Sequence, residues 1–440
     1  MNNNSMLIQR PLKQINKVNT KNSISRHKNP RRSITIRIKL IIIFFLHQGR
    51  KTKMIDASIT YFPVGNGDTT LIQLSDETSI LIDCNVTQDS EDESKEDVYP
   101  VRDHVVKKIL KDMDNVPHLD VFILTHPDED HCRGFGDVFY TGEPSDYGEK
   151  DLKEGKIQID ELWFSPRMFS PYEKKGELSE SAKCVYNEAK RRMKLYKDNN
   201  SRSKEPGNRL RIIGYSDNEE LKGLESIIIT PGSSINLIND NVKSDFSFFL
   251  HAPFREDNDS ELSERNGTSI VLQARFDIGN VKNAGLAFFG GDSQCAIFEK
   301  IIERSEKQDL EWDLFLAPHH CSWHFFNELS YEKDPTPSQK ILDFLKMSRE
   351  GAFIIASCKP IVDDEDNPPH FAAANEYKKK VQEGKFIVTM EWPNKEESIP
   401  ICFRMTQMGP QMNDFQTSES IVSSAAIKSV IRTPQTYGKQ

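Results

Sequence analysis

Apolar and polar positions alternate along the chain in two rhythms, one typical of strands and the other of helices. Short apolar runs at 58–62, 70–74 and 79–83 are separated by turn residues, as in strands that follow one another closely. From 101 to 113 the apolar residues recur at helical spacing, and the β-branched run 119–124 then predicts a buried strand. Strands that alternate with helices predict an α/β fold.

The same alternation continues through most of the remaining chain. It predicts further strands at 159–164, 226–230, 270–276, 286–289, 312–317 and 352–357, and further helices at 179–196, 296–304, 341–345 and 372–381. The pattern is least regular between 137 and 230, where we expect an inserted region. Residues 409–440 include many Ser, Gln and Thr residues, which favours a flexible tail.

The length and the charge distribution suggest one large domain with an extension. A chain of 440 residues can form one large domain with insertions, which we expect over 54–408. Residues 1–53 contain 13 of the 58 Lys and Arg residues and none of the 67 Asp and Glu residues, so the rest carries 45 basic against 67 acidic residues, a net charge of −22. This acidic body argues against tight, sequence-independent binding to duplex nucleic acid, although net charge does not exclude a local basic groove.

Three interpretations of the basic extension stay open. Its apolar run, 40–46, is too short to span a bilayer, so no transmembrane segment is predicted. The extension is a non-native upstream translation with the true start at Met54, a basic arm for a membrane surface or nucleic acid, or a secretory signal. We favour the first, because a clean strand pattern begins directly after Met54.

The cysteines indicate a reducing compartment, and we therefore expect a cytoplasmic protein. Their number is odd, they are scattered, and no C-x-x-C pair occurs among Cys84, Cys132, Cys184, Cys295, Cys321, Cys358 and Cys402. A disulfide framework or a zinc knuckle is therefore not expected.

Four side chains with metal-binding chemistry follow the predicted strand 119–124. His126, Asp128, Asp130 and His131 place two imidazoles and two carboxylates within six residues, a donor set that suits Zn²⁺, Mn²⁺ or Fe²⁺. A turn could aim the first two at one ion and the last two at a second, and two ions roughly 3.5–4 Å apart can activate water and stabilise a displacement. The alternative is a solvated acidic loop with two incidental histidines. The spacing, directly behind a buried strand, favours the metal site.

These residues form the pattern H-x-D-x-D-H, which resembles the H-x-H-x-D-H motif of the metallo-β-lactamase superfamily with its second His replaced by Asp. That variant is characteristic of the soluble hydrolase domain of the ComEC competence proteins. Further segments resemble this family in the same order: F-P-V-G-N-G-D at 62–68, L-I-D at 81–83, F-G-G-D at 289–292, P-H-H-C-S at 318–322, A-S at 356–357 and N-P-P-H at 367–370. The resemblance covers about residues 55–385 and implies an αββα sandwich, with the region 137–230 as an insertion.

The resemblance also implies a role for each matching residue. His126 and Asp128 would bind a first metal ion, Asp130 and His131 a second, and Asp292 would bridge them. His319, or alternatively His320, would complete the second site, and Asp130 would also orient the attacking water. Asp68 would brace the site, while Asn367 and His370 would lie near the substrate, where His370 could donate a proton.

The sequence departs from the family pattern at two places. Cys321 stands where the family has Gly, so the turn there or the approach of its thiol can differ. The further histidine that usually ligates the first ion has one candidate here, His251, and the alternative for His251 is a structural residue at a strand end. Asn266 to Ser269 instead resembles a segment of the ComEC type that lacks this ligand, which would weaken the first site or favour Mn²⁺ over Zn²⁺.

The resemblance implies a hydrolase with two divalent metal ions, Zn²⁺ or Mn²⁺. We expect a phosphodiesterase or nuclease, so a nucleic acid or another phosphodiester is the expected substrate. Two alternatives remain: a hydrolase of a non-phosphate ester, amide or thioester, because the scaffold hosts many reactions, and a non-catalytic metal-binding sensor module.

Overall fold

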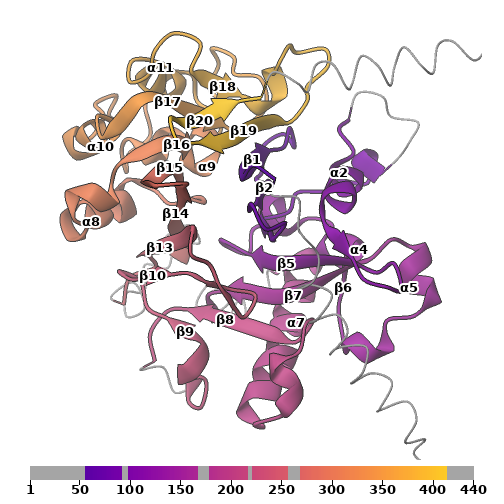
Figure 1. The fold of residues 1–440 in the computed structure, drawn as a ribbon. Coiled ribbons are helices and arrows are strands. Elements are labelled where there is room, and N and C mark those ends of the chain that lie inside the picture. Colours follow the sequence, from indigo (N-terminus) through magenta and orange to yellow (C-terminus); the bar gives the residue numbers. More distant parts are fainter. Residues whose placement is uncertain (1–54, 92–97, 167–177, 217–220, 256–267, 414–440) are drawn as a thin grey trace, which may run out of the picture. The chain divides into compact units, whose positions relative to one another are not determined.

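The computed structural model describes residues 55–91, 98–166, 178–216, 221–255 and 268–413. They form a mixed α/β unit, as predicted (Figure 1). The expected extension 1–53 and the greater part of the expected tail lie outside the described residues. Within the described residues no helix is both long and apolar enough to cross a membrane.

The larger sheet has 11 strands, and residues 126–131 follow its strand β5. Its main order is β20-β19-β1-β2-β3-β5-β7-β8-β9, with β4 paired to β5 and β6 to β7. β1 pairs antiparallel with β2 and β19, whereas β3, β5, β7, β8 and β9 run parallel. The strands are β1 (Ser58–Tyr61), β2 (Thr70–Gln73), β3 (Ser79–Ile82), β4 (Leu110–Lys111), β5 (Pro117–Ile123), β6 (Phe139–Tyr140), β7 (Ile157–Phe164), β8 (Arg209–Ile213), β9 (Ile228–Ile229), β19 (Ile401–Thr406) and β20 (Gly409–Met412).

The second sheet has seven strands in the order β10-β13-β14-β15-β16-β17-β18. Its first half is antiparallel, and β15 to β18 are parallel. The strands are β10 (Ser234–Ile235), β13 (Phe246–Ala252), β14 (Val271–Ile278), β15 (Val281–Phe289), β16 (Trp312–Leu316), β17 (Ser348–Ala356) and β18 (Phe386–Val388). A separate hairpin pairs β11 (Leu237–Ile238) with β12 (Asn241–Val242).

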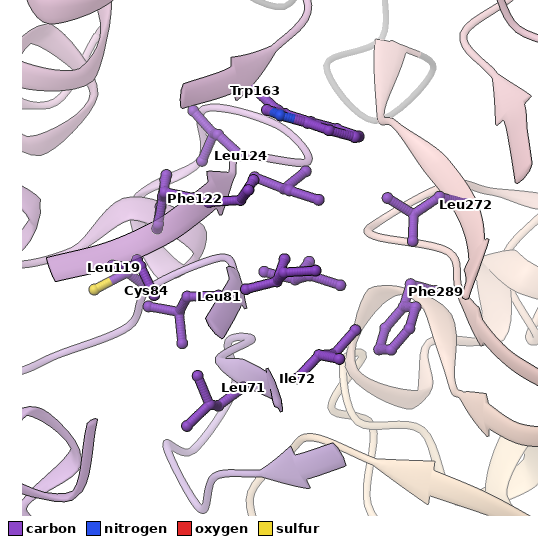
Figure 2. Packing of buried hydrophobic residues seen from close by; sticks show 14 of the residues in the cluster. Leu71, Ile72, Leu81, Cys84, Leu119, Phe122, Leu124, Trp163, Leu272 and Phe289 are labelled. Carbon is purple, nitrogen blue, oxygen red and sulfur yellow. The ribbon is translucent and has the colours of Figure 1, made fainter. Parts of the chain in front are cut away.

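The two sheets share one hydrophobic core. Figure 2 shows Leu81 and Phe122 of the larger sheet on one side of this core, with Leu272 and Phe289 of the smaller sheet opposite them. The alternation along β15 explains how the smaller sheet serves two cores. Phe289 belongs to the shared core, while its neighbour Phe288 points to the other face, where it belongs to a second core.

Helices lie against the sheets and bury apolar stripes there. α8, α10 and α11 contribute to the second core of the smaller sheet, and α2, α4 and α7 contribute to the core of the larger sheet. α7 confirms the helix predicted at 179–196, and Ser179 caps it by accepting a hydrogen bond from the nitrogen of Ala182. The α-helices are α2 (Val101–Lys108), α3 (Glu129–Cys132), α4 (Phe135–Val138), α5 (Glu149–Lys153), α7 (Glu180–Lys197), α8 (Cys295–Arg304), α9 (Pro318–Cys321), α10 (Gln339–Leu345) and α11 (Phe371–Lys378).

The structure differs from the sequence prediction in three places. The region expected to be an insertion, 137–230, supplies β7 and β8, which extend the larger sheet next to β5. Residues 409–412, assigned above to the tail, form β20 and pair with β19. The helix expected over 101–113 ends at Lys108, because the chain then pairs with β5. The pairing of β7 with β5 and β8 joins segments far apart in the sequence, whereas β4 with β5 and β19 with β20 are local hairpins. Periodicity within a segment reports none of these pairings.

Candidate metal centre

Side chains of both sheets meet where parallel strands end. Asp83 follows β3, and His126 follows its parallel neighbour β5. In the other sheet Asp292 follows β15, and His320 follows the parallel strand β16. The carboxyl ends of parallel strands meet at one edge of a sheet, which is why these distant residues come together.

The carboxylate of Asp292 lies at the middle of the cluster. Its Oδ2 is 3.3 Å from Nε2 of His126, and its Oδ1 is 3.1 Å from Nε2 of His131. All three side chains are almost completely buried. The Nε2 of His319 is further away, at 3.8 Å from Asp292 Oδ2, and the His319 side chain is 18% exposed. It therefore lies on the open side of the cluster.

His320 extends the cluster in a second direction. Its Nε2 is 3.1 Å from His131 Nε2, 3.3 Å from Asp130 Oδ2 and 3.5 Å from Asp292 Oδ1. The pair His319 and His320 adopts left-handed backbone angles, with φ of 51° and 52°, which is unusual for residues other than glycine. This turn directs His320 inward and leaves His319 at the rim. The geometry thus places His320 closer to the other donors than His319, although the sequence had favoured His319 as the ligand.

Two carboxylates contact the opposite edges of these imidazoles. Asp83 Oδ2 lies 2.7 Å from Nδ1 of His131, and Asp68 Oδ1 lies 3.6 Å from Nδ1 of His320. Asp68 also falls in a compact group with His131 and His320. However, its near neighbour is the Nδ1 edge of His320, whereas Nε2 of that ring faces the other donors. Asp68 is thus placed to orient His320, and the bracing role expected of it stays a prediction.

The pKa values show how strongly the charged groups interact. Burial raises the pKa of Asp292, but the opposite effect of His131, His320 and His126 is larger. The pKa of Asp292 is therefore well below its usual range. Burial lowers the pKa of His131, but Asp292 and Asp83 raise it well above its usual value. Burial likewise lowers the pKa of His320, but the nearby carboxylates raise it to about 10. Without a metal ion, protons on the imidazoles balance the carboxylates. A metal cation would displace those protons when it binds.

The donor atoms fit a divalent cation. His126, His131 and Asp292 offer ligand atoms that all lie within 4.8 Å of one another. His126 Nε2 and Asp292 Oδ1 are buried, and despite their close charged neighbours neither atom makes a hydrogen bond of good geometry among the described residues. Buried polar atoms without partners are costly, and imidazole with carboxylate is a donor set that suits Zn²⁺ or Mn²⁺. The residues present therefore fit the metal that the motif predicts.

Other predicted site residues are placed differently. Asp128 occupies the N-cap position of α3 and belongs to neither compact group of metal-binding side chains found among the described residues. His251 is buried, stacks on Phe288 at 4.8 Å between ring centroids, and lies 3.1 Å from Ser305 Oγ through its Nδ1. Burial lowers the pKa of His251 to about 3, as in a neutral structural histidine. The structure thus gives His251 the environment of the structural alternative.

The residues expected near the substrate organise the loop before α11. Asn367 Oδ1 accepts hydrogen bonds from Ser322 Oγ at 2.8 Å and from the backbone nitrogen of Trp323 at 3.0 Å. His370 caps α11, because its Nδ1 accepts a hydrogen bond from the nitrogen of Ala372 at 3.2 Å. Neither residue belongs to the compact groups of metal-binding side chains in the described part of the chain.

Cys321, the departure from the family pattern, is buried and has a positive φ of 68°. Its carbonyl oxygen accepts a hydrogen bond from the backbone nitrogen of His370 at 3.0 Å. Burial raises the pKa of the Cys321 thiol to about 12, so the thiol is neutral at physiological pH. A neutral buried thiol is a poor metal ligand. Cys321 therefore adopts the same left-handed backbone conformation that the family's glycine would adopt easily.

Sequence reasoning gave no site role to Asp83 or Thr125. Asp83 has a φ of 58° and is fully buried, and it accepts hydrogen bonds from the nitrogen and the Oγ1 of Thr125 at 2.7 and 2.6 Å. A strained, buried carboxylate is a recognised sign of a functional site. The available signal in the sequence was a polar residue directly after an apolar strand, at each of these two positions.

Comparisons with known proteins identify no family. No protein-family pattern matches the chain, and no curated protein does either. A solved structure from Parabacteroides distasonis ATCC 8503, named "Putative metal-dependent hydrolase", is similar at 10% sequence identity over 76% of this chain and 92% of that chain. Its TM-score is 0.29, and a similarity at this level carries no argument about fold family or activity.

Proposed function

We propose that the protein is a metal-dependent hydrolase with the metallo-β-lactamase type of sandwich. The observation that carries this proposal is the convergence of His126 Nε2, His131 Nε2 and both oxygens of Asp292 in a buried cluster between two sheets. The sheets sharing a core and the helices on their outer sides are compatible with that sandwich. The ordered motifs of the sequence support the same assignment.

We propose a centre for two divalent ions, Zn²⁺ or Mn²⁺. His126, His131 and Asp292 would hold the first ion. His320 and Asp130, with Asp292 shared, would hold the second. The pairing of His126 with Asp128 at one ion, which the motif implied, stays a prediction. When bound, such ions make water more acidic and stabilise negative charge that develops on the substrate.

The remaining polar residues have distinct tasks in this proposal. Asp130 has a side chain that is 31% exposed, so one oxygen can face His320 while the other orients a water molecule. His319, at the open side, can donate a hydrogen bond to a substrate oxygen. His370 uses Nδ1 to cap α11, so in the neutral ring the proton is on Nε2, the nitrogen with which it would donate to a leaving group.

The substrate class that we propose is a phosphodiester, a short nucleic acid or a smaller ester. This rests on the family resemblance and on the general suitability of paired divalent ions for phosphoryl oxygens. The acidic body of the chain favours short or small substrates over duplex nucleic acid, which requires an extended basic surface.

The test combines metal analysis with hydrolysis assays. Purified protein is loaded with Mn²⁺ or Zn²⁺, its metal content is measured, and it is incubated with bis(p-nitrophenyl) phosphate, single-stranded DNA, duplex DNA and RNA. We expect Asp292→Ala to lose bound metal and to reduce hydrolysis by about 100-fold or more. Asp277→Asn is the matched control, because Asp277 pairs with Lys282 and belongs to neither metal-binding group among the described residues.

The other outcomes separate the alternatives. Turnover of carboxylic esters, amides or thioesters in place of phosphodiesters would identify a hydrolase of another class. Stoichiometric metal binding without turnover of any substrate would favour a sensor module. A wild-type protein that binds neither Mn²⁺ nor Zn²⁺ would refute the proposal.

A further inference from the structure

We infer that Thr125 is a positioning residue that connects His126 to the carboxylate of Asp83, so that one buried carboxylate controls the protonation pattern of two imidazoles at once. The inference rests on the metal centre proposed above and concerns a residue to which neither the motif nor the cluster of donors assigns a role. It is based on which atom donates in each hydrogen bond among Asp83, Thr125, His126 and His131.

The hydroxyl group of Thr125 donates its proton in a hydrogen bond to Asp83. Thr125 Oγ1 lies 2.6 Å from Asp83 Oδ2, and a carboxylate can only accept, so the hydroxyl donates. The other carboxylate oxygen, Oδ1, accepts from the backbone nitrogen of Thr125 at 2.7 Å. Thr125 is therefore held at two points, and all of these atoms belong to buried residues.

This hydrogen bond determines which nitrogen of His126 carries the proton. His126 Nδ1 lies 3.1 Å from Thr125 Oγ1, which has no further proton to donate and can only accept. The Nδ1 of His126 is thus an N–H, and Nε2, 3.3 Å from Asp292 Oδ2, is the nitrogen left to bind a metal ion. The short polar path runs from His126 through Thr125 to Asp83.

Asp83 acts on the second imidazole directly. Its Oδ2 lies 2.7 Å from Nδ1 of His131, so that nitrogen donates, and Nε2 of the neutral ring is free to bind a metal. Thr125 Oγ1 and His131 Nδ1 both contact Asp83 Oδ2, so the two branches of the path end on the same carboxylate oxygen. The two atoms are 3.5 Å apart. One anion thereby prepares two ligands, His126 through the hydroxyl of Thr125 and His131 without an intermediary.

The two branches allow a positioning role of Thr125 to be distinguished from a purely structural role. Removing the Thr125 hydroxyl disconnects His126 but leaves the contact between Asp83 and His131 intact. Removing the Asp83 charge affects both rings. A purely structural role for Thr125, in contrast, would disturb stability without changing which nitrogen of His126 is protonated.

The experiment uses the full chain with ¹⁵N-labelled histidine and three variants, Thr125→Val, Thr125→Ser and Asp83→Asn. Valine keeps the shape of threonine without the hydroxyl, and serine keeps the hydroxyl. When its ring is neutral, His126 of the metal-free protein should show signals of protonated Nδ1 in the wild type and in Thr125→Ser. We expect a mixture of the two neutral forms in Thr125→Val.

Metal affinity provides a second readout. Titration with Mn²⁺ and Zn²⁺ against a competing chelator should show affinity about 10–100-fold weaker for Thr125→Val and wild-type affinity for Thr125→Ser. Asp83→Asn should weaken binding at least as much, because both rings lose their partner. Thermal unfolding of each metal-free variant checks that the fold is retained.

The outcomes separate this inference from the proposed function. Wild-type His126 signals together with wild-type metal affinity in Thr125→Val would overturn the inference and leave the metal centre standing. Failure of the wild-type protein to bind metal would overturn the metal centre, while the His126 signals of the metal-free variants would still decide whether Thr125 positions the ring.

Discussion

His320 is held by backbone and side-chain atoms on the edge of its ring that points away from the other donors. Its Nδ1 lies 3.1 Å from the carbonyl oxygen of Ser357 and 3.6 Å from Asp68 Oδ1. The backbone nitrogen of Gly67 lies 3.2 Å from the same atom, and the Gly67 carbonyl accepts from Ser357 Oγ at 2.6 Å. The orientation of His320 therefore depends on the close approach of Gly67.

Replacement of Gly67 by alanine should disrupt this contact. Gly67 has a φ of 147°, and a Cβ there would lie 2.6 Å from the carbonyl oxygen of Asp130 and even closer to the amide of Asn85. We expect Gly67→Ala to lower the free energy of unfolding and to weaken metal binding. Gly65→Ala is the matched control, because Gly65 also has a positive φ, 76°, but its Cβ would meet nothing within 4 Å. Backbone strain alone, about 1–2 kcal/mol, is expected for the control. Equal stability and equal metal affinity of the two variants would contradict this account.

At the level of elements, β5 carries titratable groups at both ends. His126 follows its carboxyl end, and His118 lies near its start, where Nδ1 is 2.7 Å from Asp160 Oδ1 of the neighbouring β7. Burial lowers the pKa of His118, but Asp160 and Asp112 raise it to about 10. The protonated His118 thus joins β5 to β7, at the opposite end of β5 from His126.

This ion pair predicts a specific dependence of stability on pH. Because the pKa of His118 is about 10 in the folded chain and near 6.5 when unfolded, its stabilising contribution is complete below pH 6.5 and is lost as the pH rises through about 10. We expect His118→Gln to lower the free energy of unfolding most at pH 6 and progressively less towards pH 10. Denaturant unfolding of wild type and variant across this range measures the difference. A difference that grows with pH would contradict the assigned pKa.

At the level of the whole molecule, the proposed ligands come from both sheets. His126 and His131 follow β5 of the larger sheet, whereas Asp292 and His320 follow β15 and β16 of the smaller sheet. A bound ion would therefore connect the two sheets at the edge where their strands end. Metal binding and the stability of the sandwich should be coupled for this reason.

The coupling predicts stabilisation by the metal ion. At a free Mn²⁺ or Zn²⁺ concentration 100 times the dissociation constant, we expect the free energy of unfolding to rise by about 2.7 kcal/mol. Thermal unfolding with metal and with excess chelator measures this effect as a change in Tm, which should be absent in Asp292→Ala and present in Asp277→Asn. A Tm that metal does not change in the wild type would count against a centre that joins the sheets.

Local chemistry was sufficient to locate the motif and to identify an α/β chain. A polar, imidazole-rich segment directly after the apolar strand 119–124 is visible in the sequence because strand burial and turn polarity are properties of neighbouring residues. Asp292 and the His319–His320 pair were predicted from the resemblance of segments 289–292 and 318–322 to the family. Long-range pairing lay beyond this local reasoning, as the parallel pairing of β7 with β5 and with β8 shows.

The choice among neighbouring donors required the folded chain. Whether His319 or His320 faces Asp292 depends on left-handed backbone angles in a turn, and the roles of Asp83 and Thr125 depend on contacts across 42 and 48 positions of sequence. Such contacts form because parallel strands from distant segments end at one edge, and periodicity within a segment carries no information about them. Residue chemistry thus indicated what kind of centre to expect, and the packing of two sheets determined which atoms compose it.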